Sequence, residues 1–126
     1  MEIADHIITY QGDVPQHGIY AGENNVIYFD SQHTHTVLIE NIDCFSQQKR
    51  CFIRTYPFRT YTRSESLGRA FDLLNDMPST TLFTSDEHFV AWCINGDLTP
   101  GTNSKNRSNQ AETPVRMTVK KILTSA

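Results

Sequence analysis

The first half of the chain contains a series of short runs rich in β-branched and aromatic residues, a composition typical of β-strands. Five such runs occur, at residues 6–10, 18–21, 26–29, 35–39 and 51–56. Turn signals containing Gly, Pro, Asn or Asp follow the first three runs, at residues 11–15, 22–25 and 30–32. Because connections this short favour antiparallel neighbours over βαβ crossovers, the runs predict a small antiparallel sheet.

The hydrophobic period changes after this series. Between residues 64 and 76, apolar side chains recur at i, i+3, i+4 and i+7, namely at Leu67, Ala70, Phe71 and Leu74. This spacing predicts a helix, with Ser64 as its N-cap. A second helix is expected over Asp86–Asn95, ended by Gly96. The pattern therefore indicates an α+β fold in which a small antiparallel sheet packs on two or three helices.

The composition predicts one globular domain with a different C-terminal end. The chain has 126 residues, of which 38% are hydrophobic and 20% are charged. We expect a domain over residues 1–97, a polar loop or linker over 98–113, and a basic segment over 114–126 that docks on the domain.

The charge is distributed unevenly between these parts. Residues 1–97 hold six Lys/Arg and thirteen Asp/Glu, a charge of -7, whereas residues 98–126 hold five and one, a charge of +4. An acidic domain argues against nucleic acid as the main partner, because phosphate binding depends on clustered Lys and Arg. No apolar run approaches the ~20 residues of a membrane span. The acidic start does not resemble a secretory signal, and three cysteines without a CxxC pair indicate reduced thiols, so we expect a cytoplasmic protein.

Two motifs resemble a known family. "QHGIYAGENNVIYF" (16–29) and "EHFVAWCINGD" (87–97) are similar to the lecithin:retinol acyltransferase-like (LRAT-like) domains of the permuted papain-like cysteine hydrolases and acyltransferases. The family pattern has a His two residues before Gly-Ile-Tyr-x-Gly, then Val-Ile-His, then Asn-Cys-Glu-His-Phe at a helix start. The likeness spans roughly residues 3–97. It implies a permuted papain-like architecture and a thiolate that a strand histidine activates to transfer acyl groups.

The resemblance also implies that all three catalytic positions have changed. Asp86 stands at the cysteine position, Gln16 at the first histidine position and Tyr28 at the second. Aspartate is a poor acyl-transfer nucleophile, and a fixed anion would repel the oxyanion that forms during the reaction. It is well suited to a helix start, where we expect Asp86 to act as a cap. We therefore expect a catalytically silent binding or interaction module without cofactors, of which an accessory or inhibitor protein is one form.

An enzyme remains the alternative: an atypical acyl hydrolase or acyltransferase using Asp86 with His17 or His88. Successive strand side chains point to opposite faces, so His17 should face away from Gln16 unless a bulge lies beside Pro15. We expect His88 to hydrogen-bond in the core. Because none of the three cysteines occupies the nucleophile position, thiol chemistry is not expected.

A segment of interleaved arginines and aromatics, residues 54–63, is the best candidate for contact with a partner. The residues assigned to binding are those of the former cleft and this segment: Gln16, His17, Tyr28, Asp86, Arg54, Tyr56, Arg59 and Tyr61. We expect the partner to be another protein, with a small acyl or lipid-like ligand in the cleft as a second option. Asp30, His33 and His35 have a spacing that metals use, but no second ligand cluster accompanies them, so no metal is expected.

Overall fold

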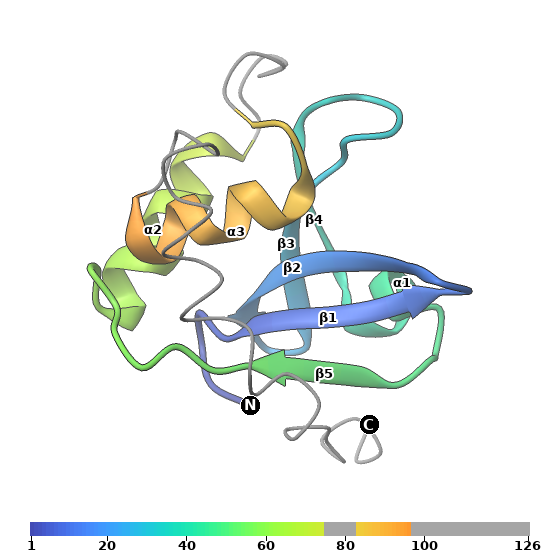
Figure 1. Cartoon of the computed structure of the whole chain (residues 1–126), viewed down its shortest axis with the longest axis horizontal. Coiled ribbons are helices and arrows are strands. Elements are labelled where there is room, and N and C mark those ends of the chain that lie inside the picture. The colour runs from blue at the N-terminus through green and yellow to red at the C-terminus, as the bar shows by residue number, and fades with distance from the viewer. Residues whose placement is uncertain (75–82, 97–126) are drawn as a thin grey trace.

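The computed structural model describes residues 1–74 and 83–96, which form an antiparallel sheet with helices on both faces (Figure 1). The strands are β1 (His6–Gln11), β2 (Val14–Gly22), β3 (Asn25–Phe29), β4 (Val37–Asn41) and β5 (Cys51–Arg54). Their order across the sheet is β4-β3-β2-β1-β5, with every neighbouring pair antiparallel. This confirms the α+β class and the antiparallel pairing expected from the short connections.

Three helices complete the described chain: α1 (Ile42–Ser46), α2 (Arg63–Leu73) and α3 (Asp86–Asn95). Helix α3 has the predicted bounds and ends at Gly96, whose φ of 80° is accessible to glycine at little cost. The prediction of Ser64 as the α2 cap was wrong. Thr62 caps α2, because its hydroxyl accepts the Glu65 N–H while the Glu65 carboxylate accepts the Thr62 N–H.

The sheet separates two hydrophobic clusters. On one face Ile19 and Ile27 pack against α2 and α3 through Ala70 and Phe89. On the other face a smaller cluster joins the sheet to α1, and its buried members are Ile7, Val26, Ile42, Phe45 and Cys51. The short helix α1 carried no periodic signal and was not predicted. Its N-cap is Asn41, the last residue of β4, whose side chain accepts the Asp43 N–H.

One glycine allows α1 to approach the sheet. A Cβ atom at Gly18 of β2 would collide with the Val26 side chain and crowd the Phe45 ring. A bulkier residue there would push Phe45 away from β2. Gly18 therefore helps to set the position of Phe45, which lines the site described below.

The linker (98–113) and the basic segment (114–126) expected from the sequence lie outside the described residues. Within residues 1–74 and 83–96, no helix has the length and apolar character needed to cross a bilayer.

Candidate functional site

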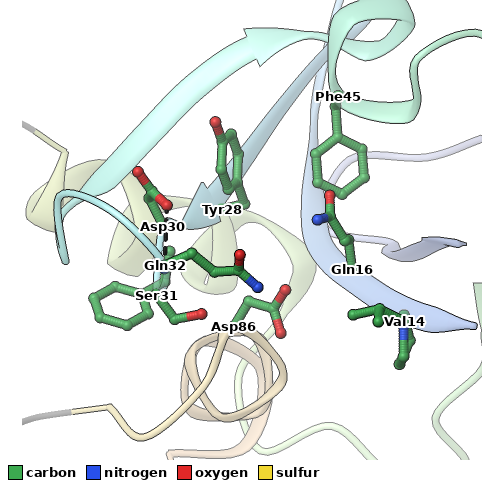
Figure 2. Close-up of a pocket in the computed structure, with 10 residues that line it drawn as sticks. Val14, Gln16, Tyr28, Asp30, Ser31, Gln32, Phe45 and Asp86 are labelled. Carbon is green, nitrogen blue, oxygen red and sulfur yellow. Dashed lines mark hydrogen bonds between the residues drawn. The ribbon is translucent and has the colours of Figure 1, made fainter. Parts of the chain in front are cut away.

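A pocket of about 230 Å³ opens where the start of α3 meets the sheet and α1 (Figure 2). Its walls come from the start of β2, the end of β3 with the loop that follows, α1, and the first residue of α3. The lining residues are Val14, Pro15, Gln16, Tyr28, Phe29, Asp30, Ser31, Gln32, Phe45 and Asp86. Segments far apart in the sequence thus bring Gln16, Tyr28 and Asp86 to one cavity.

Asp86 is the first residue of α3, and its carboxylate holds the helix against β2. Its Oδ2 accepts the backbone N–H of His17 at 3.0 Å. The N-cap is the preceding residue, because the Ser85 hydroxyl accepts the His88 N–H. Our expectation that Asp86 is the cap residue was therefore wrong, although its carboxylate accepts N–H groups at the helix start as well as that of His17.

The environment of Asp86 changes its acidity. Burial raises the pKa of its carboxyl to about 6, although hydrogen bonds from backbone N–H groups, led by that of His17, oppose the rise. A carboxylate that titrates close to neutral pH in a cavity is a feature of functional sites, although structural groups show it too.

Tyr28 and Phe45 provide aromatic walls. Their ring centroids lie 5.4 Å apart with the planes inclined at 52°. Burial, with Glu40 adding to it by its charge and a hydrogen bond, raises the pKa of the Tyr28 hydroxyl well above its ordinary value. Tyr28 is thus a neutral hydroxyl at any physiological pH, and it cannot act as a base there.

Asp30 shapes the loop that forms another wall. Its carboxylate accepts the backbone N–H groups of Gln32, His33 and Thr34 at 3.2–3.3 Å. Partial burial alone would raise its pKa, but these bonds and one from the Thr34 hydroxyl outweigh burial and lower it. Asp30 therefore serves as a permanent anion that orders the loop. In the described part of the chain, no group of three or more His, Cys, Asp or Glu side chains is arranged to hold a metal ion.

His17 lies on the face of β2 opposite to Gln16, as strand alternation requires. The β1–β2 pairing runs without a register shift through Pro15, Gln16 and His17, so no bulge turns His17 toward Gln16. The His17 ring is buried, and its Nδ1 lies 2.8 Å from Nε2 of His6 on β1. Nδ1 of His6 in turn lies 2.6 Å from the Tyr56 hydroxyl.

Burial lowers the pKa of both histidines. The pKa of His17 falls to about 4; the Glu87 charge opposes this shift and the Arg54 charge adds to it. The pKa of His6 also falls well below its ordinary value, first because of burial and then because of the His17 charge. We did not predict a role for His6 from the sequence. It lies in a predicted strand, and the β1–β2 register decides whether its ring meets that of His17.

His88, the other histidine considered as a base, is buried and has a hydrogen bond in the core, as expected. Its Nδ1 accepts the Thr84 N–H at 3.2 Å, and its ring meets Phe83 edge-on. Neither His17 nor His88 lines the pocket.

The aromatic and basic residues of 54–63 make internal contacts away from the pocket. Arg54 pairs with Glu87 at 2.7 Å, and Arg59 donates to the Ala4 carbonyl at 3.0 Å. The Tyr61 ring stacks on the Arg69 guanidinium. Phe58, with 74% of its surface exposed, is the member of this segment most available for outside contact.

None of the three cysteines is among the pocket-lining residues. Cys51 and Cys93 are buried, whereas Cys44 is exposed on α1. Burial raises the pKa of the Cys51 thiol to about 11 and that of Cys93 still further, which keeps both thiols protonated and unreactive.

No family model matches this sequence, and no curated protein matches it either. The site must therefore be interpreted from its own chemistry. It combines one carboxylate held by backbone N–H groups, a second carboxylate that orders a loop, three aromatic residues and two amides in a small cavity. These groups suit ligand binding, and none of the described lining residues offers a thiol or an imidazole.

Proposed function

We propose that this protein is a catalytically silent LRAT-like domain that acts as a binding module through the pocket around Asp86. The observation that carries the proposal is the position and bonding of Asp86. It stands where the family motif has its nucleophile, at the start of a helix and in a cavity with Gln16 and Tyr28, and its carboxylate is bonded to the His17 N–H.

The chemistry of the cavity supports the loss of acyl transfer. A cysteine nucleophile needs a base to take its proton and a second group to orient that base, and the two histidine positions of the motif carry an amide and a neutral phenol. The Asp86 anion would also disfavour a neighbouring oxyanion, since two like charges in a partly buried site repel. We propose a permuted papain-like arrangement in which this cleft has kept its shape and lost its reaction.

We further propose that the module works in the cytoplasm with a protein partner, as an accessory or inhibitor protein. Three cysteines that form no disulfide fit a reducing compartment. Acidic residues outnumber basic ones over residues 1–97, which fits a protein partner better than a nucleic acid.

One observation favours the alternative, an atypical acyl hydrolase. The pKa of Asp86 is raised to about 6, and a carboxyl of this kind can act as a general acid or base. Hydrolysis of p-nitrophenyl butyrate separates the two functions. We expect wild type and Asp86→Asn to give the same background rate. Turnover by wild type that a folded Asp86→Asn variant loses would establish the enzyme.

Restoring the family residues tests the resemblance itself. We would compare Asp86→Cys with the triple variant Gln16→His/Tyr28→His/Asp86→Cys, both in a Cys44→Ser background that removes the exposed thiol. A general base contributes roughly 10²–10⁴-fold, so the introduced thiol of the triple variant should be acylated at least tenfold faster. Equal rates in two folded variants would contradict the LRAT-like arrangement of the cleft.

A further inference from the structure

The charge of the pocket lining has one sign. Within residues 1–74 and 83–96, the charged side chains that line it are Asp30 and Asp86, and no Lys or Arg is among the lining residues. Both carboxylates are partly withdrawn from water, which makes an uncompensated anion costly. An anionic ligand such as a fatty acid would add to this cost, whereas a cation would relieve it.

The aromatic walls favour the same kind of ligand. Tyr28 and Phe45 stand at 52° to one another, so that the two rings enclose a corner of the pocket (Figure 2). The faces of aromatic rings carry partial negative charge and attract ammonium groups at about 0.5–2 kcal/mol per contact, depending on desolvation. An aromatic corner beside a carboxylate is a recurrent arrangement for binding organic cations.

The size and the remaining polar groups limit what enters. A cavity of about 230 Å³ is smaller than the sites of drug-sized ligands and suits a group of several heavy atoms. The side-chain carbonyls of Gln16 and Gln32 and the hydroxyl of Ser31 can accept hydrogen bonds from an N–H donor. An alkylammonium has such donors and an apolar stem that Val14 and Phe45 can cover.

We propose that the pocket binds a primary alkylammonium group, with Asp86 as its counter-ion and with Tyr28 and Phe45 as its aromatic walls. The proposal rests on the proposed function, because it assigns a ligand class to the same pocket. Two sources supply this chemistry: a free amine, and the lysine side chain of a partner protein.

Titration of the isotope-labelled full chain by NMR tests the proposal with n-butylammonium, n-butanol and butyrate as matched probes. We expect n-butylammonium to shift the amide signals of Gln16, Gln32 and Asp86 in a saturable manner. The alcohol has the same stem without the charge, and butyrate has the opposite charge. Tighter binding of either control, or shifts that map elsewhere, would overturn the assignment.

Two variants locate the interaction. Asp86→Asn keeps the shape and removes the charge, and we expect affinity to fall by about tenfold or more, as for other charged hydrogen bonds. Asp72→Asn, which removes an exposed carboxylate of α2 outside the pocket lining, should leave affinity unchanged. If Asp86→Asn does not fold, Tyr28→Leu serves instead, with an expected loss of about threefold or more. Equal affinity in folded Asp86→Asn and wild type would refute the counter-ion role.

The source of the ammonium group follows from one further probe, Nα-acetyl-lysine N-methylamide. Binding at the same signals identifies a lysine side chain as an acceptable guest, whereas binding of n-butylammonium alone identifies a free amine. The two proposals fail separately. If the triple reversion restores thiol acylation and no ammonium probe binds, the ligand class is wrong and the silent LRAT-like module stands.

Discussion

Nε2 of His6 lies 2.8 Å from Nδ1 of His17, so that two buried imidazoles on neighbouring antiparallel strands share one hydrogen bond. One ring must donate the proton and the other must accept it. Two neutral rings satisfy this bond, while two charged rings would break it and repel each other in a site that excludes water. The sheet therefore depends on at least one of these histidines staying neutral.

This dependence predicts acid sensitivity. The folded-state pKa of His17 is about 4, below the ordinary 6.5. The contribution of neutral His17 to the free energy of unfolding is therefore complete above pH 6.5 and is lost as pH falls through 4. The full loss amounts to about 3 kcal/mol. Urea unfolding at pH 7.5 and pH 4.5 should show the decrease in the free energy of unfolding. In His17→Gln, already less stable at pH 7.5, this acid-dependent part should be missing. An unchanged pH dependence in that variant would contradict the role of His17.

Asp86 is expected to act in the opposite sense. Its folded-state pKa of about 6 lies above the ordinary 3.8, so its ionised form weakens the fold above pH 6, and lowering the pH from 6 to 3.8 removes this cost. Asp86→Asn should therefore raise the free energy of unfolding at pH 8 by at most about 3 kcal/mol, and the melting temperature should rise with it. Asp86→Ala should be less stable than Asp86→Asn by about 1–3 kcal/mol, because it leaves the His17 N–H without its acceptor. Thermal melting of the three proteins at pH 8 checks both differences, and a lower melting temperature for Asp86→Asn would show that the charge stabilises the fold.

The caps provide a separate test of the helix starts. Ser85→Ala removes the acceptor of the His88 N–H at the start of α3 and should cost about 0.5–2 kcal/mol. Thr62→Ala should cost a similar amount at α2. Ser64→Ala is the matched control: it is exposed inside α2, and alanine has the higher helix propensity there. Chemical denaturation measures the free energy of unfolding of all three variants. If Ser64→Ala loses as much stability as Thr62→Ala, Thr62 is not the N-cap of α2.

Binding of the ammonium probe should depend on pH through Asp86. The carboxylate is charged above its pKa of about 6 and neutral below it, so affinity for n-butylammonium should be constant from pH 7 to 8 and should fall below pH 6. A bound cation would itself lower this pKa. Other ionisable groups near Asp86 are Glu87, beside it on α3, and His17 of β2, whose backbone N–H bonds to the Asp86 carboxylate. The neutral Tyr28 hydroxyl and the ionised Asp30 do not change charge in this range. Constant affinity between pH 5 and pH 8, measured by NMR titration, would exclude Asp86 as the counter-ion.

Local patterns in the sequence were sufficient for most elements. Alternating β-branched and aromatic residues with short turns predicted the strands, and helical spacing predicted α2 and α3, because both signals depend on residues a few positions apart. The motif spacing also singled out Gln16, Tyr28 and Asp86, which line one pocket. The five-residue helix α1 was not predicted, because it is shorter than two helical turns and its apolar residues show no helical periodicity.

The contacts that give the site its chemistry were decided by tertiary structure. Asp86 and the N–H of His17 are 69 positions apart, and only the docking of α3 against β2 makes that N–H available to the carboxylate. The His6–His17 pair needs the β1–β2 register that sets His6 opposite Ile19, because a shift of one residue would turn one ring to the other face. The pKa values of His17 and Asp86 follow from the same placement, since burial is their main cause. Residue identity sets which groups can titrate, and the packing of distant segments decides how far water is excluded from them.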